Sequence, residues 1–269
     1  MEIVRNNDEI LSLNDNEING TPKIENSKIS FAGINNVLFC ENNVNLVHCN
    51  IFFKGNNSLV YLSSSKGNYS CNLHVANDSA VYIWKNNDLT PPINLNVQEH
   101  QNLIIGDDCS IGSNTNIRTS DAHIIYDEST KKRFNNGSSV FIGDHVWLGH
   151  QTYVERGSII GSGAVVENNS HVSVDSILKS NSLYQGNPIN LVKKGVFFTK
   201  DYAPKFTKQD SDAFDTYNSR IFLYDDVAGE TLDIKKVDEL LSQFSVKDKF
   251  DFIQKLFIQN KKHNRFSIK

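Results

Sequence analysis

Branched apolar residues recur at every sixth position through the middle of the chain. Small or polar residues separate them, and the position directly after the branched residue is often glycine. A helix cannot keep a period of six, and glycine and β-branched residues also oppose one. A short strand followed by a turn fits the period. The pattern therefore predicts stacked strands with one inward apolar column: Ile105, Ile111, Ile117, Ile142, Leu148, Val154, Ile160, Val166, Val172, Leu178 and Tyr184.

We expect three hexads to form the three sides of one triangular coil. Coils of this kind can stack, because parallel pairing with the coils above and below satisfies the backbone hydrogen bonds of each strand. Small residues dominate four positions after each branched residue, where a corner is expected. We therefore predict a parallel β-helix over residues 101–195.

The rhythm breaks between Ile117 and Ile142, because their separation exceeds a whole number of hexads by a single position. The intervening segment 119–139 is polar and contains a turn-like Asn-Asn-Gly, so we expect it to leave the coil as a loop. Long excursions from a regular scaffold are more often functional than accidental.

The flanking segments lack the hexad. Residues 1–100 contain strand-like runs between turns rich in glycine and paired asparagines, which tolerate left-handed backbone at tight corners. We expect an irregular β-domain there that caps the solenoid, with a hinge at Pro91-Pro92; a continuation of the coils is the alternative.

Residues 196–269 are expected to form an extension with two helices. Apolar residues from Ile234 to Phe244 take helical spacing, and Ser245 with Asp248 forms a capping signature for a second helix. In that helix Phe250, Ile253, Leu256 and Phe257 share a face. We expect this tail to pack on the solenoid, with a role in acceptor or partner binding as the alternative.

Composition narrows the function classes. The chain has 269 residues, a net charge of −4 and a pI of about 6.1, so nothing indicates a nucleic-acid surface. No apolar run approaches membrane-spanning length and the N-terminus lacks a signal region, which favours the cytoplasm. The four cysteines show no zinc-ligand spacing, so we expect reduced, buried thiols and no metal.

From Ile105 to Lys194 the sequence resembles the hexapeptide-repeat acyltransferases. The resemblance rests on the repeat, on "IGDHVWLGHQTYVERGSIIGSGAVV" and on the closing "GNPINLVKK". It implies a mainly β protein with a left-handed parallel β-helix, assembled as a homotrimer with active sites between subunits. The branch it resembles most is the one that O-acetylates sugars, including bacterial surface polysaccharides, which implies acetyl-CoA as co-substrate and a glycan acceptor in a bacterial cytoplasm.

The resemblance also implies roles at the loop. His123, in an Asp-x-His motif, is expected to take the proton of the acceptor hydroxyl as general base. Asp121 or Asp127 could orient its ring, and the sequence does not choose between them. Trp147 is expected to hold the thioester carbonyl or oxyanion with its indole N–H and to pack against the donor.

Acetyl-CoA, the acyl donor, is expected to bind on the coils after Trp147. Small residues there would let its pantetheine arm approach the backbone, and the lysines that follow "GNPIN" would bind its phosphates. The residues expected to bind the cofactor are Trp147, Gly149, Gly161, Ser162, Gly163, Ala164, Lys193 and Lys194. Arg118 and Arg133 suggest a carboxylate-bearing acceptor such as sialic acid, and His145 is expected to line it. His145 and His150 also have the spacing of two zinc ligands in a carbonic anhydrase of this fold, but no third ligand is evident.

An O-acetyltransferase working by direct transfer is the main hypothesis, because the motif places no cysteine or serine nucleophile. One alternative is an N-acetyltransferase of an amino-sugar nucleotide. Another is a non-enzymatic β-solenoid scaffold, which would need neither the histidine loop nor the GNP ending.

Overall fold

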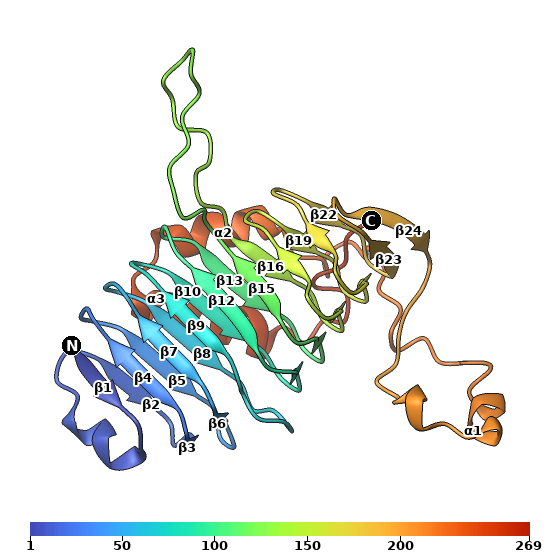
Figure 1. Cartoon of the computed structure of the whole chain (residues 1–269), viewed down its shortest axis with the longest axis horizontal. Helices are drawn as coiled ribbons and strands as arrows, with labels where there is room; N and C mark the ends of the chain where they lie inside the picture. Colours follow the sequence, from blue (N-terminus) through green and yellow to red (C-terminus); the bar gives the residue numbers. More distant parts are fainter.

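The structure is a computed structural model that describes the backbone of all 269 residues and every side chain except those of Phe257 and Ile258. Its body is a solenoid with three flat sides, called sides A, B and C below (Figure 1). The place expected for Phe257 on a helix face therefore lies outside the described side chains.

Each side is one sheet, in which strands far apart in sequence lie next to each other. Side A consists of β1 (Glu2–Val4), β4 (Lys28–Phe31), β7 (Asn50–Phe53), β9 (Asn72–Val75), β12 (Ile93–Val97), β15 (Thr115–Arg118), β18 (Tyr153–Val154) and β21 (His171–Val172). Side B consists of β2 (Glu17–Asn19), β5 (Val37–Cys40), β8 (Leu59–Leu62), β10 (Ala80–Ile83), β13 (Asn102–Ile105), β16 (Val140–Ile142), β19 (Ile159–Ile160) and β22 (Ile177–Leu178).

Side C is shorter. It consists of β11 (Asp88–Leu89), β14 (Ser110–Ile111), β17 (Trp147–Leu148), β20 (Val165–Val166), β23 (Ser182–Gln185) and β24 (Asn190–Lys194). A pair, β3 (Lys23–Glu25) and β6 (Asn45–Val47), stands beside the first coils as a separate small sheet. All pairs are parallel except β1 with β4 and β23 with β24.

The predicted inward column is confirmed. All of its members are buried, with exposed fractions of 0% to 7%, and they belong to one continuous apolar core. The chain is thus mainly β, with the left-handed parallel β-helix fold that the hexads and the resemblance predict.

The coils have two sizes. In the first half the sequence separation between stacked neighbours reaches 22, as between Asn72 and Asn94, whose side chains hydrogen-bond across adjacent coils. In the second half the separation falls to 18, as between Asp144 and Ser162, which is three hexads. Strands of the first half are mostly three to five residues long, whereas most of those after β16 have two. We call the two kinds wide and narrow coils below.

Residues 1–100 are not the irregular domain that we expected. Sides A and B run without a break from the first strands to the last, so this segment continues the coils. Pro91-Pro92 lies between β11 and β12, inside a coil and not at a hinge. The paired asparagines do mark corners, since Asn43, Asn57 and Asn169 have φ near +60°.

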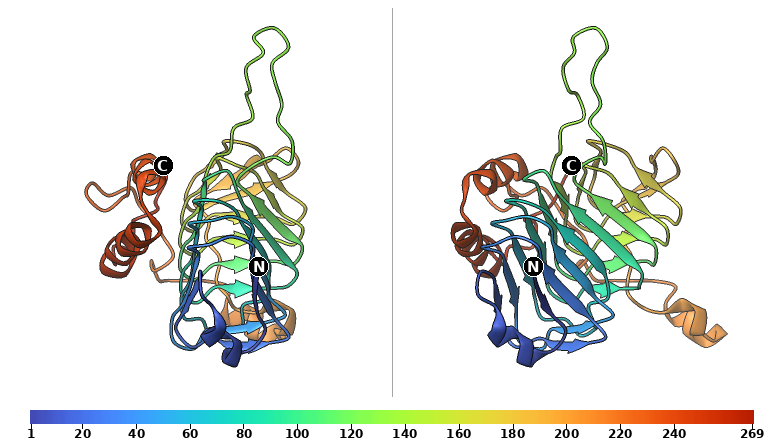
Figure 2. Two further views of the ribbon diagram at one scale, coloured as in Figure 1. Left: turned by 90° about the vertical axis from the view of Figure 1, so that its left-hand side faces the viewer. Right: turned by 60° about the vertical axis from the view of Figure 1, so that its left-hand side comes forward.

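The segment 119–139 leaves the corner between sides A and B. β15 ends at Arg118 and β16 begins at Val140, and the intervening chain projects from the body as a long loop (Figures 1 and 2).

The C-terminal helices α2 (Ile234–Gln243) and α3 (Val246–Ile253) lie on side B. Figure 2 shows them along one side of the solenoid only. The Ser245 hydroxyl accepts the Asp248 amide as expected for the cap, and the Lys249 ammonium donates to the Asp78 carbonyl beneath the helix.

Shorter helical turns complete the chain: η1 (Asn7–Ser12), η2 (Ala203–Lys205), α1 (Lys208–Ala213) and the π-helical η3 (Gln254–Gln259). α1 belongs to an arm that projects away from the body (Figure 1). No helix in the described part of the chain has the length and apolar character needed to cross a bilayer.

Candidate active site

Asn135 ties the two legs of the loop together at its base. Its side chain is buried, and its Nδ2 donates to Asp121 Oδ2 at 2.9 Å and to the His123 carbonyl at 2.8 Å. Its Oδ1 accepts the Ile125 amide at 2.8 Å. One side chain thus fixes the backbone at His123 and Ile125 and holds the Asp121 carboxylate. Sequence reasoning missed it, because "NNG" was interpreted only as a turn.

Asp121 is held by cations and not by the histidine ring. Arg118 approaches its Oδ1 and Arg156 its Oδ2, each at 3.3 Å, and Asn135 donates to it. Burial tends to raise the pKa of Asp121, but the Asn135 hydrogen bond and the two arginines outweigh this and lower it. The carboxylate therefore stays ionised and anchors the loop to the coils.

Arg118 links the loop to the next two coils of side A. Its guanidinium binds Glu155 through two nitrogens, at 2.6 and 2.9 Å, and lies over the Tyr153 ring. Glu155 also contacts His171 Nε2 at 3.1 Å. Arg133, the other arginine expected at the acceptor, pairs with Glu99 at 2.6 Å. Both guanidinium groups therefore already have carboxylate partners within the chain.

His123 stands in the exposed part of the loop. Asp127 does not orient it, since that carboxylate accepts hydrogen bonds from Ser129 and Thr130 at the loop tip, which lower its pKa to about 2. Neither candidate aspartate hydrogen-bonds to the ring in this structure, so the single chain positions His123 through its backbone.

Trp147 lies on side C, with 39% of its surface exposed. In a three-sided coil, side C is the side opposite the corner between A and B from which the loop leaves. One chain therefore does not bring Trp147 and His123 together. The register connects Trp147 to another candidate instead, because Trp147, Val165, Leu183 and Lys193 are successive partners across side C.

The small residues expected beneath pantetheine lie in a covered corner. Gly161, Ser162, Gly163 and Ala164 are all buried, and Gly149 is buried at the next corner. Ala164 points into the core, and the Ser162 hydroxyl accepts the Asp144 amide at 2.9 Å. The C-terminal segment covers this corner: a Cβ on Gly163 would meet the Tyr224 ring, and one on Gly143 would meet Phe266. In the single chain this corner is therefore covered, whereas we expected pantetheine to lie against it.

His145 does not line an acceptor site. Its ring is 1% exposed and is stacked between Phe198 and Phe222, with centroids 4.1 and 4.0 Å away. Nδ1 lies 2.9 Å from an Asp108 oxygen, and Nε2 lies 2.9 Å from the Phe198 carbonyl. This histidine fastens the C-terminal arm to the coil. No group of the described residues is placed to hold a metal ion.

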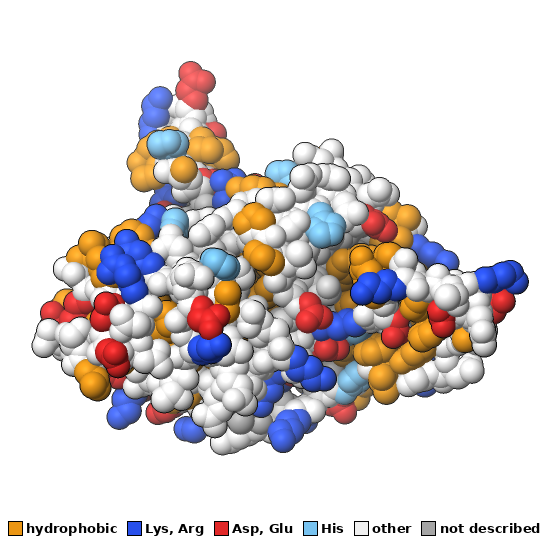
Figure 3. Space-filling view, turned by 60° about the horizontal axis from the view of Figure 1, so that its bottom comes forward, with side chains coloured by type: hydrophobic (Ala, Val, Ile, Leu, Met, Phe, Trp, Pro, Cys, Tyr) orange, Lys and Arg blue, Asp and Glu red, His pale blue; other side chains and the backbone are white. Residues whose placement is uncertain are grey.

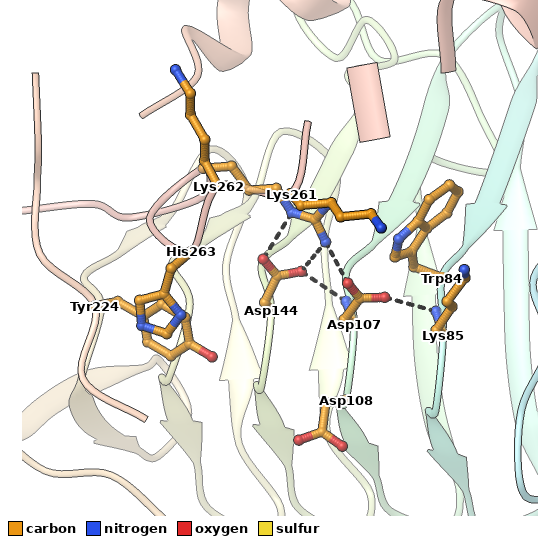
Figure 4. A pocket seen from close by; sticks show the side chains of 10 residues that line it. Trp84, Lys85, Asp107, Asp108, Asp144, Tyr224, Lys261, Lys262 and His263 are labelled. Carbon is orange, nitrogen blue, oxygen red and sulfur yellow. Dashed lines mark hydrogen bonds and ion pairs between the residues drawn. The ribbon is translucent and has the colours of Figure 1, made fainter. Parts of the chain in front are cut away.

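A polar pocket of about 450 Å³ lies beside this corner (Figure 4). On its floor Arg265 clasps Asp144 and Asp107, with nitrogen–oxygen distances of 2.7–2.9 Å. Burial and the neighbouring Asp144 raise the pKa of Asp107 to about 6, although Arg265 opposes the shift. The clasp holds the end of the chain against the coils.

Lys193 and Lys194, the two lysines that end the solenoid, are exposed on β24. Lys194 lines a cavity of about 320 Å³ together with Lys179 and Lys269. Asp225 and Asp226 line the same cavity, and Lys269 pairs with Asp226 at 3.5 Å, so the lysine charges there are partly offset.

Comparison with known proteins agrees with the repeat. A family model described as the hexapeptide repeat of succinyl-transferase matches residues 139–173. A polysialic acid O-acetyltransferase of Neisseria meningitidis is 31% identical over 133 residues, which make up 49% of this chain and 60% of the relative. One from Escherichia coli O1:K1 / APEC is 38% identical over 104 residues, 39% of this chain and 33% of the relative. The chain thus spans less than two thirds of the length of these curated relatives.

Two solved structures extend the similarity to the fold. The polySia specific acetyltransferase NeuO superimposes with a TM-score of 0.62 at 25% identity, covering 75% of this chain and 96% of that one. The polysialic acid O-acetyltransferase OatWY gives 0.56 with the same identity and coverage. In repeat, sequence and fold, the chain is therefore a hexapeptide-repeat β-helix protein that resembles the polysialic acid O-acetyltransferases.

Proposed function

We propose that the chain transfers the acetyl group of acetyl-CoA to a hydroxyl of a sialic-acid-containing bacterial glycan in the cytoplasm. The observation that carries the proposal is the loop of His123, which leaves a hexapeptide coil at one point and is stapled at its base by buried Asn135. The two polysialic acid O-acetyltransferase relatives and the NeuO and OatWY folds support the same activity.

In the proposed reaction His123 removes the hydroxyl proton while the sugar oxygen attacks the thioester carbonyl. The carbonyl oxygen gains charge as the tetrahedral intermediate forms, and the Trp147 indole N–H stabilises it. The C–S bond then breaks, the CoA thiol leaves with the proton, and the acetyl ester remains on the sugar. The step needs no enzyme nucleophile.

The site is completed by a second copy in this proposal. His123 and Trp147 belong to opposite parts of one coil, so the loop of one chain would reach side C of another in a homotrimer. The loop is suited to such a contact because exposed apolar side chains surround His123: Ile124, Ile125, Tyr126 and Phe134, each 47–62% exposed.

The donor is proposed to lie along side C, since the corner at Gly161–Ala164 is covered. Trp147 at one end of the side C row and Lys193 at the other would meet the thioester and the phosphates. Lys194 and Lys179 add cations at the phosphate end, whereas Lys269 is paired with Asp226. Arg118 and Arg133 would reach an acceptor carboxylate only by exchanging Glu155 and Glu99.

The test is thiol release from acetyl-CoA with a panel of sialylated glycans, comparing wild type with His123→Ala. We expect release that needs a sugar hydroxyl and disappears in the variant. Activity with only an amino-sugar nucleotide would replace the proposal with N-acetyl transfer, and failure to bind acetyl-CoA would overturn it.

A further inference from the structure

The outer face of side A carries two straight rows of side chains, most of them polar. Because the strands pair in register, the first row stacks Lys28, Asn50, Asn72, Asn94 and Asn116. The second row stacks Ser30, Phe52, His74, Asn96 and Arg118. The rows cross five adjacent strands, about 19 Å at roughly 4.8 Å per strand.

The asparagine row leaves hydrogen-bonding capacity unused. Asn72 Nδ2 donates to Asn94 Oδ1, and Asn94 Nδ2 donates to Asn116 Oδ1, both at 3.1 Å. A primary amide has two N–H donors and two acceptor lone pairs, so each bond in the row occupies only one of either kind. Asn50 and Asn72 are exposed and Asn94 is half-buried, which leaves the remaining donors and acceptors facing solvent.

The charge of the face differs from that of the chain. Neither row contains an acidic residue, although the whole chain carries −4. Lys28 supplies an ammonium group, whereas Arg118 is already paired with Glu155 and Asp121, and burial together with Lys54 lowers the pKa of His74. Lys54 adds a further cation, above the Phe52 ring. Much of the molecular surface in Figure 3 is likewise neither charged nor hydrophobic. Such a face complements an anionic polymer whose repeating units present hydroxyl and amide groups.

The face is also continuous with the candidate active site. Helices α2 and α3 cover side B, and Tyr224 and Phe266 cover the corner between sides B and C, so these described parts of the C-terminal segment lie away from side A (Figure 2). The second row ends at Arg118, which contacts Asp121 at the base of the His123 loop. A polymer lying along the rows would therefore lead to the loop.

We propose that the side A face is a track for a sialic-acid-type anionic glycan polymer, which binds along the asparagine row with one segment delivered to the His123 loop. This inference rests on the proposed function, because the acceptor of that function is the polymer that lies on the track. It predicts that long acceptors bind more tightly than short ones, through contacts remote from the chemistry.

The test uses Asn72→Asp, with Asn19→Asp as matched control. Both substitutions place one negative charge at an exposed strand position, but Asn19 ends β2 on side B. Binding of long-chain polysialic acid is measured by titration without acetyl-CoA, in the His123→Ala background as well as in wild type. We expect Asn72→Asp to weaken polymer binding about tenfold and Asn19→Asp less than about twofold.

Turnover of a sialic acid trisaccharide should change less than about twofold in Asn72→Asp, because a short acceptor needs only the loop end of the track. Equal polymer affinities for the two variants would overturn the track while leaving acetyl transfer intact. Polymer binding that responds to Asn72→Asp in a protein without transferase activity would instead overturn the proposed function and keep the track.

Sedimentation of both variants completes the experiment. The assembly should be the same as for wild type, since a glycan track is not a subunit contact. Dissociation caused by Asn72→Asp alone would show that the face is an interface between copies of this chain, and would overturn the proposal.

Discussion

The two halves of the solenoid both fill an apolar interior, but they do so with coils of different size. The wide coils of the first half have longer sides and enclose aromatic side chains, such as the stacked pair Phe31 and Phe53 with centroids 4.7 Å apart. The narrow coils of the second half consist of three hexads each, and branched aliphatic residues fill most of their interior.

The two kinds of coil also differ in the candidate functional residues that they carry. A longer side offers more outward positions, and the asparagine row of side A stands mostly on the wide coils. The narrow coils follow the hexad strictly, and the His123 loop leaves the solenoid where they begin. Under the two proposals above, acceptor contacts fall on the wide coils and the chemistry falls at the narrow end.

The largest effect should come from removing the proposed base. We expect His123→Ala to lower kcat by about 10²- to 10⁴-fold, because no other group would take the hydroxyl proton. His48→Asn is the control on the wide coils, where this histidine has φ of 55°, which asparagine tolerates. Thiol-release assays check both; equal losses would break the assignment of chemistry to the narrow end.

The next largest effect should be a loss of folding stability when the interior of a wide or a narrow coil is changed. Phe53→Ala should destabilise the wide coils by about 3–5 kcal/mol, because the cavity left beside Phe31 cannot close fully. Val154→Phe should cost about 1–3 kcal/mol by overpacking a narrow coil. Urea unfolding measures both, with exposed Ile177→Ala as the control. A narrow coil that accepts phenylalanine at no cost would contradict the size difference.

A smaller effect is expected at the loop base. Asn135→Ala removes the hydrogen bonds that fix the backbone around His123, so we expect kcat to fall about tenfold with little change in KM for acetyl-CoA. Trypsin should then cut faster at Lys131, Lys132 and Arg133, a readout that needs no activity. Asn136→Ala, its exposed neighbour, should leave both unchanged.

The smallest effect concerns the clasp that ties the chain end to the narrow coils. The pKa of Asp107 is raised to about 6, so the folded state holds its proton more tightly than the unfolded state. The resulting stability is complete below about pH 4 and is lost as the pH rises through 6. About a third of the side chain is exposed, so solvent screening leaves about 1 kcal/mol. Thermal unfolding of Asp107→Asn between pH 4 and 7 should lose this slope.

The sequence by itself determined the narrow half. A period of six admits only a strand and a turn, so the inward column, the limits of the loop and the position of His123 follow from local pattern. The C-terminal helices also follow, because helical spacing and the Ser245 cap are local signals. The wide coils lack such a signal, since their sides vary in length and similar positions recur only once in a whole coil.

Only the tertiary structure decided which predicted site residues meet solvent. The corner at Gly161–Ala164 and the ring of His145 are covered by segments that come much later in the chain. No periodicity reports such contacts, because they depend on where the C-terminal arm folds back. The role of Asn135 could not be predicted for the same reason. Its partners Asp121, His123 and Ile125 face it only once the loop has closed, since hydrogen bonds across a loop arise from the path of the whole chain.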